Sequence, residues 1–206
     1  MRIGTYMIKE RGRPKQYDAE TALQAAGLVF WAKGYNGTSL DDLSLAMEMN
    51  RPSIYRAFGD KKEIYRLALA QFAKQMDSAF NLAMLDEKDF QKGLGAFFKN
   101  ALDIYSSSGS TLGCMFWCTA PAAAFDHPDV QADLLNAIKD VDKQILKQVD
   151  QAIKQGQLHK DTDAVCLSKM IQALLHSIAI RARAGESKVS LRKFADSAVL
   201  LLLTKN

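Results

Sequence analysis

Cysteine, histidine and long apolar runs are all scarce in this chain of 206 residues. Three cysteines do not make the disulfide framework of a small secreted domain. The three histidines, His127, His159 and His176, belong to no recognisable metal or nucleophile motif. No run of about 18 apolar residues is present, and the N-terminus lacks the apolar segment of a signal peptide. We therefore expect a cytoplasmic protein with no membrane span, no metal and no cofactor.

Catalytic groups and a large net charge are also missing. No acid, base and nucleophile occur together in a known pattern, so we expect no enzyme activity. The net charge is only +4. Five basic residues against one acidic residue lie between positions 2 and 15, so this short arm accounts for the whole excess. Arg11 and Arg13 in this arm could enter a DNA minor groove, or the arm could be a solvated tail.

The composition favours an all-α fold. Apolar residues make up 48% of the chain, only 4 prolines and 12 glycines occur, and no strand-like alternation persists. Apolar residues recur instead at helical spacing, as in the stripe from Ala22 to Phe30. The pattern predicts nine helices, at about 18–33, 39–47, 50–58, 60–86, 90–105, 111–125, 129–155, 161–184 and 190–204.

Residues 38–62 predict a helix-turn-helix followed by the start of a long helix. Ser39 and Asp42 form a capping pair for the first helix, and Glu48-Met49 makes the turn. Asn50 caps the second helix, in whose first turn a proline is tolerated. Gly59 ends this helix in a left-handed conformation, and Asp60 caps the next one.

The second helix of such a unit enters the DNA major groove by its N-terminal residues. Here those residues are Arg51, Ser53 and Arg56, and an arginine can pair with guanine through two hydrogen bonds. Lys61 and Lys62 begin the following helix, whose N-terminus favours anions, so we expect phosphate contacts there. The spacing alone also allows an ordinary helical hairpin with a polar face and two solvated lysines.

Several short motifs make the resemblance to a known family specific. They are the F/W-x-x-G-Y pattern at Phe30 to Tyr35, Thr38-Ser39, Pro52-Ser53-Ile54-Tyr55, and Phe58-Gly59-Asp60-Lys61. Residues 12–69 resemble the N-terminal DNA-binding domain of the TetR family of bacterial transcriptional repressors. Residues 113–129 resemble a segment found in a subgroup of these regulators. Two positions depart from the family: Glu48 stands where a glycine is common in the turn, and Ala57 replaces an aromatic residue.

The resemblance implies a helix-turn-helix domain at 1–62 and a helical ligand-binding and dimerisation domain at 63–206. The expected partners are double-stranded operator DNA, a second copy of the chain and an unknown small molecule. We expect DNA contacts from Arg11, Arg13, Thr38, Ser39, Arg51, Pro52, Ser53, Tyr55, Arg56, Lys61 and Lys62.

The second half of the chain carries aromatic, methionine and polar side chains of the kind that line ligand pockets. The same side chains make ordinary cores, and the sequence leaves both interpretations open. The candidates are Phe97, Phe98, Tyr105, Met115, Phe116, Trp117, Met170 and His176.

The last two predicted helices are more apolar than one core face requires. The resemblance implies that they pair with those of a second subunit as a four-helix bundle. The expected interface residues are Ile171, Leu174, Leu175, Ile178, Phe194, Ala198, Leu201 and Leu202.

Two alternatives to a ligand-released repressor remain open. Cys114 and Cys118 share one helix face, so they could form a thiol-redox sensor, although their apolar context favours inert thiols. The protein could also bind DNA without any ligand. The sequence does not distinguish a repressor from an activator.

Overall fold

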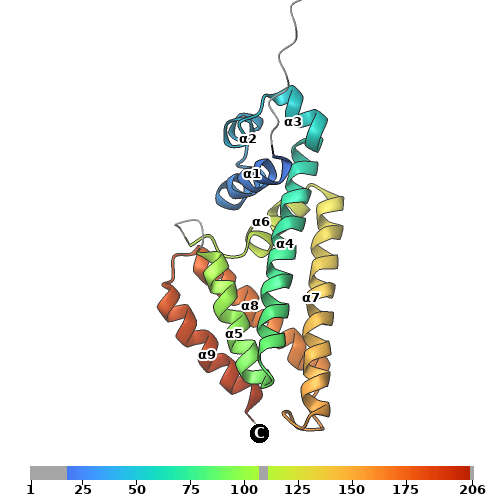
Figure 1. Ribbon diagram of the computed structural model, residues 1–206, viewed down its shortest axis with the longest axis vertical. Coiled ribbons are helices and arrows are strands. Elements are labelled where there is room, and N and C mark those ends of the chain that lie inside the picture. Colours follow the sequence, from blue (N-terminus) through green and yellow to red (C-terminus); the bar gives the residue numbers. More distant parts are fainter. Residues whose placement is uncertain (1–17, 107–110, 205–206) are drawn as a thin grey trace, which may run out of the picture.

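The computed structural model describes residues 18–106 and 111–204, which form nine helices and no strand (Figure 1). The expected all-α fold is thus confirmed. The helices are α1 (Ala19–Lys33), α2 (Leu40–Ala46), α3 (Arg51–Phe58), α4 (Lys61–Asp86), α5 (Phe90–Tyr105), α6 (Met115–Ala124), α7 (Pro128–Lys154), α8 (Ala164–Arg183) and α9 (Lys188–Leu203).

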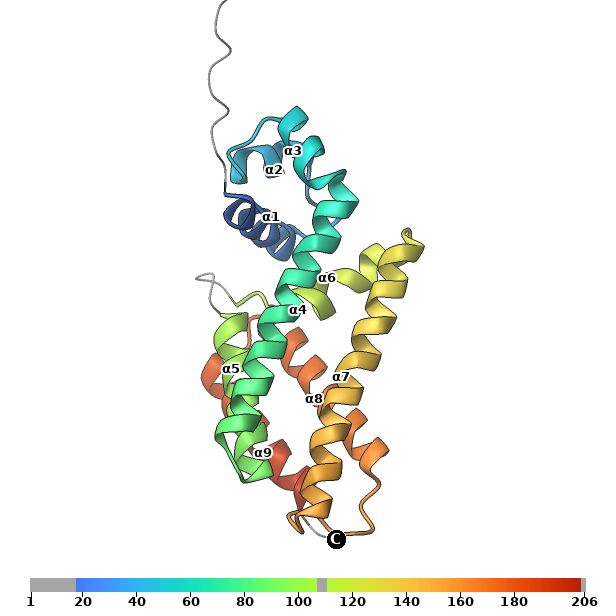
Figure 2. The same cartoon turned by 45° about the vertical axis from the view of Figure 1, so that its right-hand side comes forward.

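The molecule is elongated, and three short helices occupy one end of it. Helices α1, α2 and α3 form this end, and α4 runs from them down to the opposite end (Figures 1 and 2). Helices α5 and α7 pack against the lower part of α4, α8 packs against α5 and α7, and α9 covers α5 and α8, with α6 between the two parts of the molecule. The predicted division after Lys62 falls in the first turn of α4, whose backbone continues through it.

Side-chain caps fix the starts of the helices at the α1–α3 end. Asp18 caps α1, and Ser39 and Asp42 form the reciprocal capping box of α2. Asn50 caps α3 by accepting a hydrogen bond from the backbone N–H of Ser53, and Asp60 caps α4. All four caps are confirmed. They could be predicted from the sequence because a cap depends on residues within one turn of each other.

Helix α6 begins four residues later than predicted. Gly113 has a φ of +68°, and a Cβ at this position would lie 2.2 Å from the carbonyl oxygen of Ala179 in α8. The chain therefore passes close to α8 as a non-helical segment before α6 starts at Met115. The predicted start at Thr111 was wrong because an apolar pattern does not reveal this tertiary contact.

Helix α8 is the one described helix long and apolar enough to span a membrane, with a mean hydropathy of 1.2 over its most apolar 18 residues. It packs against α5, α6, α7 and α9, and 44% of that apolar window is buried inside the protein. Ile171, Leu175 and Ile178 are part of the single hydrophobic core, so its apolar character has a structural explanation.

Candidate nucleic-acid interface and ligand cavity

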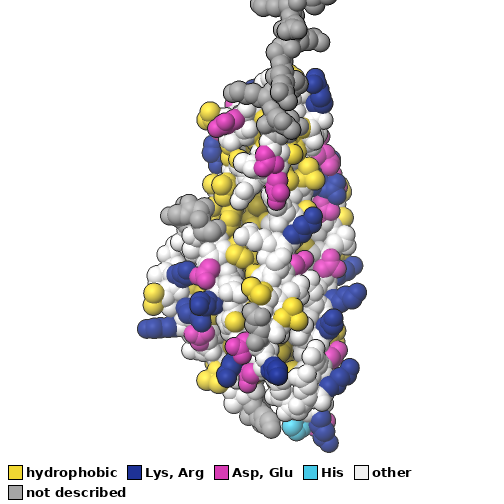
Figure 3. All heavy atoms as spheres, in the orientation of Figure 1, with side chains coloured by type: hydrophobic (Ala, Val, Ile, Leu, Met, Phe, Trp, Pro, Cys, Tyr) yellow, Lys and Arg dark blue, Asp and Glu magenta, His cyan; other side chains and the backbone are white. Residues whose placement is uncertain are grey.

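Helix α3 is held by its apolar side and presents its polar side outward. Ile54 and Phe58 are buried, whereas Arg51, Pro52 and Arg56 are exposed, and the Tyr55 side chain is 48% exposed. Ser53 is half-buried. Figure 3 shows basic side chains at this end of the molecule, beside α3. The arrangement leaves the first two turns of α3 accessible to a DNA groove.

The turn between α2 and α3 forms without the glycine that is common in the family. Glu48 has a φ of +52°, in the left-handed region that costs a non-glycine residue about 1 kcal/mol. The hydroxyl of Ser44 donates a hydrogen bond to the carbonyl of Met49, and the Met49 N–H donates to the carbonyl of Ser44. Met47 and Met49, on either side of Glu48, are buried in the hydrophobic core, and their packing offsets the strain at Glu48.

Arg51 forms an ion pair that was not predicted from the sequence. Its Nη2 lies 2.5 Å from Asp41 Oδ1, and its Nε lies 3.2 Å from the same oxygen. The hydrogen bonds with Asp41 raise the pKa of Arg51 further above its ordinary value. Asp41 belongs to α2, so the helix in front of α3 orients the first arginine of α3.

Two of the expected DNA-contacting residues are used inside the protein. Thr38 is buried, and its hydroxyl donates a hydrogen bond of 2.7 Å to the carbonyl of Gly34, so the expected phosphate contact by its side chain is wrong. The Ser39 hydroxyl is exposed but exchanges hydrogen bonds with Asp42 in the capping box. Ser39 thus fixes the start of α2.

The two lysines at the start of α4 have partners within the chain. Lys61 Nζ lies 4.4 Å from the ring centroid of Tyr35, and partial burial lowers the pKa of Lys61. Lys62 Nζ lies 2.8 Å from Asp129 Oδ2 at the start of α7. Phosphate contacts by both lysines remain predictions. Arg11 and Arg13 lie outside the described residues.

Three segments meet where the α1–α3 end joins the remainder of the protein. Trp31 Nε1 in α1 donates a hydrogen bond of 3.0 Å to the carbonyl of Gly113. The Arg183 guanidinium at the end of α8 donates to the carbonyls of Trp31 at 2.8 Å, Leu112 at 3.2 Å and Ala32 at 3.3 Å. The bonds to Trp31 and Ala32 satisfy carbonyls at the C-terminal end of α1, where a positive charge is favourable.

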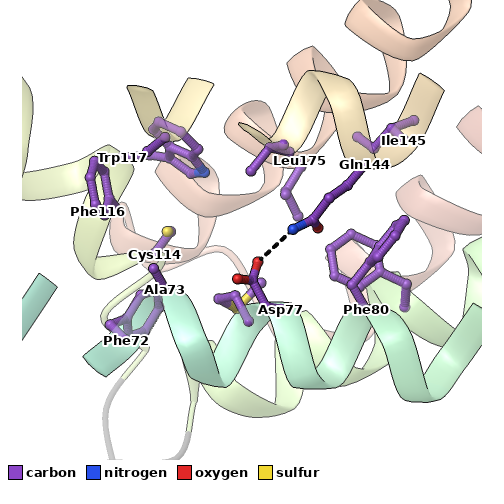
Figure 4. A pocket seen from close by; sticks show the side chains of 14 residues that line it. Phe72, Ala73, Asp77, Phe80, Cys114, Phe116, Trp117, Gln144, Ile145 and Leu175 are labelled. Atoms are coloured by element: carbon purple, nitrogen blue, oxygen red, sulfur yellow. Dashed lines mark hydrogen bonds between the residues drawn. The ribbon is translucent and has the colours of Figure 1, made fainter. Parts of the chain in front are cut away.

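A cavity of about 60 Å³ lies among α4, α5, α6, α7 and α8 (Figure 4). Phe97, Phe116 and Trp117, three of the predicted pocket residues, line it. None of the remaining lining residues was predicted as part of a pocket, and most of them belong to α4 and α7. The further lining residues are Phe72, Ala73, Met76, Asp77, Phe80, Cys114, Ala137, Val141, Gln144, Ile145 and Leu175.

The other five predicted pocket residues do not line this cavity. Phe98, Tyr105 and Met115 are fully buried in the hydrophobic core, and Met170 is 50% exposed on the outer side of α8. His176 lies against the ring of Trp117, at a centroid distance of 4.3 Å, and burial lowers its pKa. The helical periodicity of the sequence placed these residues on the core-facing sides of their helices. It could not distinguish a cavity wall from a filled core.

The cysteines occupy an environment that does not activate thiols. Cys114 is buried, and burial raises its pKa to about 12. Burial also raises the pKa of Cys118, although Arg183 opposes this effect. Both thiols are therefore protonated near neutral pH and weakly nucleophilic. No group of three or more His, Cys, Asp and Glu side chains that could hold a metal occurs among the described residues.

The predicted dimer interface needs correction in α8. Ile171, Leu174, Leu175 and Ile178 are buried within the protomer and cannot face a second copy. The exposed stripe of α8 is instead formed by Met170, Ala173 and Ile180, with the half-buried Ser177 between the last two.

In α9, Phe194 and Leu201 are exposed as expected, at 38% and 76%, whereas Ala198 and Leu202 are half-buried against the core. The Arg181 guanidinium lies 5.2 Å from the Phe194 ring centroid and joins the two helix surfaces.

Comparison with known proteins agrees with this architecture. Residues 22–68 match the family described as "Bacterial regulatory proteins, tetR family", and residues 91–198 match the "Tetracyclin repressor-like, C-terminal domain". The transcriptional repressor ComR of Escherichia coli K12 is 26% identical over 195 residues, which cover 94% of this chain and 92% of ComR.

Solved structures show the same fold. A structure of the regulator CifR with a 26-base-pair operator has a TM-score of 0.83 and 27% identity, and the match covers 91% of this chain and 98% of CifR. A regulator from Chloroflexus aurantiacus has a TM-score of 0.79 at 22% identity, with 91% of this chain and 94% of that one covered, and shows the fold alone. This chain therefore belongs to the TetR family of bacterial regulatory proteins, and it is a DNA-binding transcriptional regulator.

Proposed function

We propose that this regulator is a homodimeric, non-enzymatic cytoplasmic repressor that leaves a palindromic operator when a small molecule occupies the cavity. The observation that carries the proposal is the placement of α4. Its first turn, with Lys61 and Lys62, follows α3 directly, and its middle supplies Phe72, Asp77 and Phe80 to the cavity wall. One helix is therefore shared by the DNA-reading end and the candidate ligand site.

A ligand acts on such a molecule by binding one tilt of α4 better than another. The population then shifts away from the state in which both α3 helices match the operator. A hundredfold loss of DNA affinity requires only about 2.7 kcal/mol of coupling between the two sites. A few new contacts in an aromatic cavity supply a difference of this size.

Dimerisation follows from the exposed apolar face of α8 and α9. Met170, Ile180, Phe194 and Leu201 lie exposed on these helices, and apolar side chains gathered on one face favour contact with another chain. A two-fold dimer would place two α3 helices on successive major grooves, about 34–36 Å apart. The similarity to ComR, which is named as a transcriptional repressor, supports repression rather than activation.

Selection from a randomised duplex library at physiological salt tests this function. We expect the retained sequences to contain a palindrome, and we expect Arg51→Ala to lose part of that preference. Arg192→Ala, on α9 away from α3, is the matched control and should retain it. Recovery of no motif, with binding that disappears as salt rises, would leave only non-specific DNA binding and overturn the proposal.

A further inference from the structure

The cavity wall contains one charged side chain among the described residues that line it, Asp77 of α4. Five aromatic rings share this wall: Phe72, Phe80, Phe97, Phe116 and Trp117. Phe80 and Phe97 meet edge to face at a centroid distance of 4.9 Å, and Phe116 and Trp117 lie 5.3 Å apart. Figure 4 shows Asp77 pointing toward Gln144, with Phe116 and Trp117 to one side of it and Phe80 to the other.

The Asp77 carboxylate is only partly compensated. Its Oδ1 accepts a hydrogen bond of 3.2 Å from Gln144 Nε2, across the cavity from α7 (Figure 4). No lysine, arginine or histidine in residues 18–106 and 111–204 lies within ion-pair distance of it. A cation bound in the cavity would therefore meet a half-buried carboxylate that no basic side chain of the described residues already pairs.

A groove beside the cavity is also rich in acidic side chains. It lies between α4 and α7 and adjoins the cavity, because Ala73, Asp77, Phe116, Ala137 and Val141 line both. Its charged lining consists of four carboxylates and one guanidinium, from Glu63, Asp77, Asp133, Asp140 and Arg66. Arg66 pairs with Asp133 at 2.5 Å and with Glu63 at 3.6 Å, which leaves Asp77 and Asp140 without an ion-pair partner among the described residues. The groove therefore attracts cations and repels anions.

We propose that this cavity and groove bind an organic cation, an amine or quaternary ammonium with an aromatic or alkyl body. The charged centre lies at Asp77, and the apolar body lies against the rings, which attract a cation over their faces within about 6 Å. The inference rests on the proposed ligand-released function and names the chemical class of its ligand. The cavity accepts the compact head of the molecule, and the open groove accommodates the remainder.

Three probes of similar size and different charge test the inference by calorimetry on the full-length protein without DNA. They are benzyltrimethylammonium, its uncharged analogue dimethylbenzylcarbinol, and benzylsulfonate. We expect the ammonium to bind at least about tenfold more tightly than the carbinol, because only the ammonium forms an ion pair with Asp77 and is attracted to the ring faces. The sulfonate should bind least tightly of the three.

Variants of Asp77 locate the preference. Asp77→Asn retains the shape and the acceptor for Gln144 and should remove the preference for the ammonium, whereas Asp77→Glu should keep most of it. Asp150→Asn makes the same charge change at an exposed position of α7 that lines neither the cavity nor the groove, and should keep the preference. The thermal unfolding midpoint of each variant shows that it is folded.

Three results would overturn the inference: equal affinity for ammonium and carbinol, a preference that survives Asp77→Asn, or no binding of any probe. These results are separable from the function proposed above. A palindrome recovered by DNA selection with no cation preference would retain the repressor and remove the cationic ligand. A cation preference without any selected DNA motif would retain the cationic ligand and remove the repressor function.

Discussion

Lys62 Nζ lies 2.8 Å from Asp129 Oδ2, which ties the first turn of α4 to the first turn of α7. The hydrogen bond raises the pKa of Lys62 and lowers the pKa of Asp129, so both groups stay charged over the physiological range. The lysine that the sequence assigned to a DNA phosphate is thus already paired. Asp129 and a phosphate compete for the same ammonium group.

Asp129→Asn should strengthen DNA binding, because it frees Lys62 for a phosphate. The pair is partly exposed, so we expect a gain of only about two- to fivefold, equal for all sequences and smaller at high salt. Asp140→Asn alters the charge of α7 by the same amount without touching Lys62 and should change affinity less. A gain limited to one operator sequence would contradict this explanation. Fluorescence anisotropy with labelled duplexes measures it.

Arg51→Ala should lower operator affinity by about tenfold to a hundredfold and relax the base preference at one position of each half-site. Arg51→Lys keeps the charge but loses the planar fork, so we expect it to retain non-specific affinity and lose the preference. Selection from the randomised library separates these effects. An unchanged preferred sequence in Arg51→Ala would remove the base-reading role of this residue.

Leu201→Glu should separate the dimer. Leu201 is 76% exposed on α9, and burying it in an interface would contribute about 1.5–3 kcal/mol in each subunit, so a charge there should weaken association at least about a hundredfold. Leu85→Glu at the end of α4 removes an equally exposed leucine, at 82%, and should leave the dimer intact. Sedimentation velocity distinguishes the two. Dissociation by both variants would point to another interface.

Gly113→Ala should destabilise the fold, since the added Cβ would meet the Ala179 carbonyl oxygen at 2.2 Å in a backbone with φ of +68°. We expect about 1 kcal/mol from the conformation and about 1–3 kcal/mol from crowding. Gly156→Ala has φ of +71° and no atom within 4 Å of its Cβ, so it should show the conformational cost alone. Chemical unfolding measures both. Equal losses would mean that α8 moves aside freely.

Alkylation of the native protein at pH 8 should modify Cys166 first. Cys166 is exposed, whereas burial raises the pKa of Cys114 to about 12, which leaves very little thiolate at that pH. Mass spectrometry after brief iodoacetamide treatment identifies the labelled site. We also expect dilute peroxide to leave operator affinity unchanged in Cys166→Ser. A loss of affinity there would support the thiol-redox alternative.

Local features of the structure could be predicted from the sequence. Asp18, Ser39, Asn50 and Asp60 cap helices through hydrogen bonds to the next few residues, so a short window contains the whole interaction. Helix α5 was predicted at its observed bounds for the same reason, since a polar break and a single apolar stripe define it. The helix-turn-helix followed from such local signals together with its family motifs.

Tertiary relationships could not be predicted in this way. The apolar pattern of α8 does not reveal that Ile171 faces the core while Met170, one residue earlier, faces outward. Asp77 was not predicted as a pocket residue because it lies among polar residues of a long helix. Its hydrogen bond with Gln144 joins residues more than sixty positions apart, which no local pattern reveals. The pairing of Lys62 with Asp129 likewise joins helices far apart in the sequence.

Arg183 joins the last turn of α8 to the last residues of α1, and α8 also carries half of the exposed apolar face. In a dimer built on that face, the contact between the two α8 helices therefore sets the distance between the two α3 helices, although no part of this contact touches a base pair. Substitutions along the outer stripe of α8 would alter the operator spacing that fits the protein while leaving its sequence preference within each half-site unchanged. Spacing and sequence could then diverge independently among related regulators.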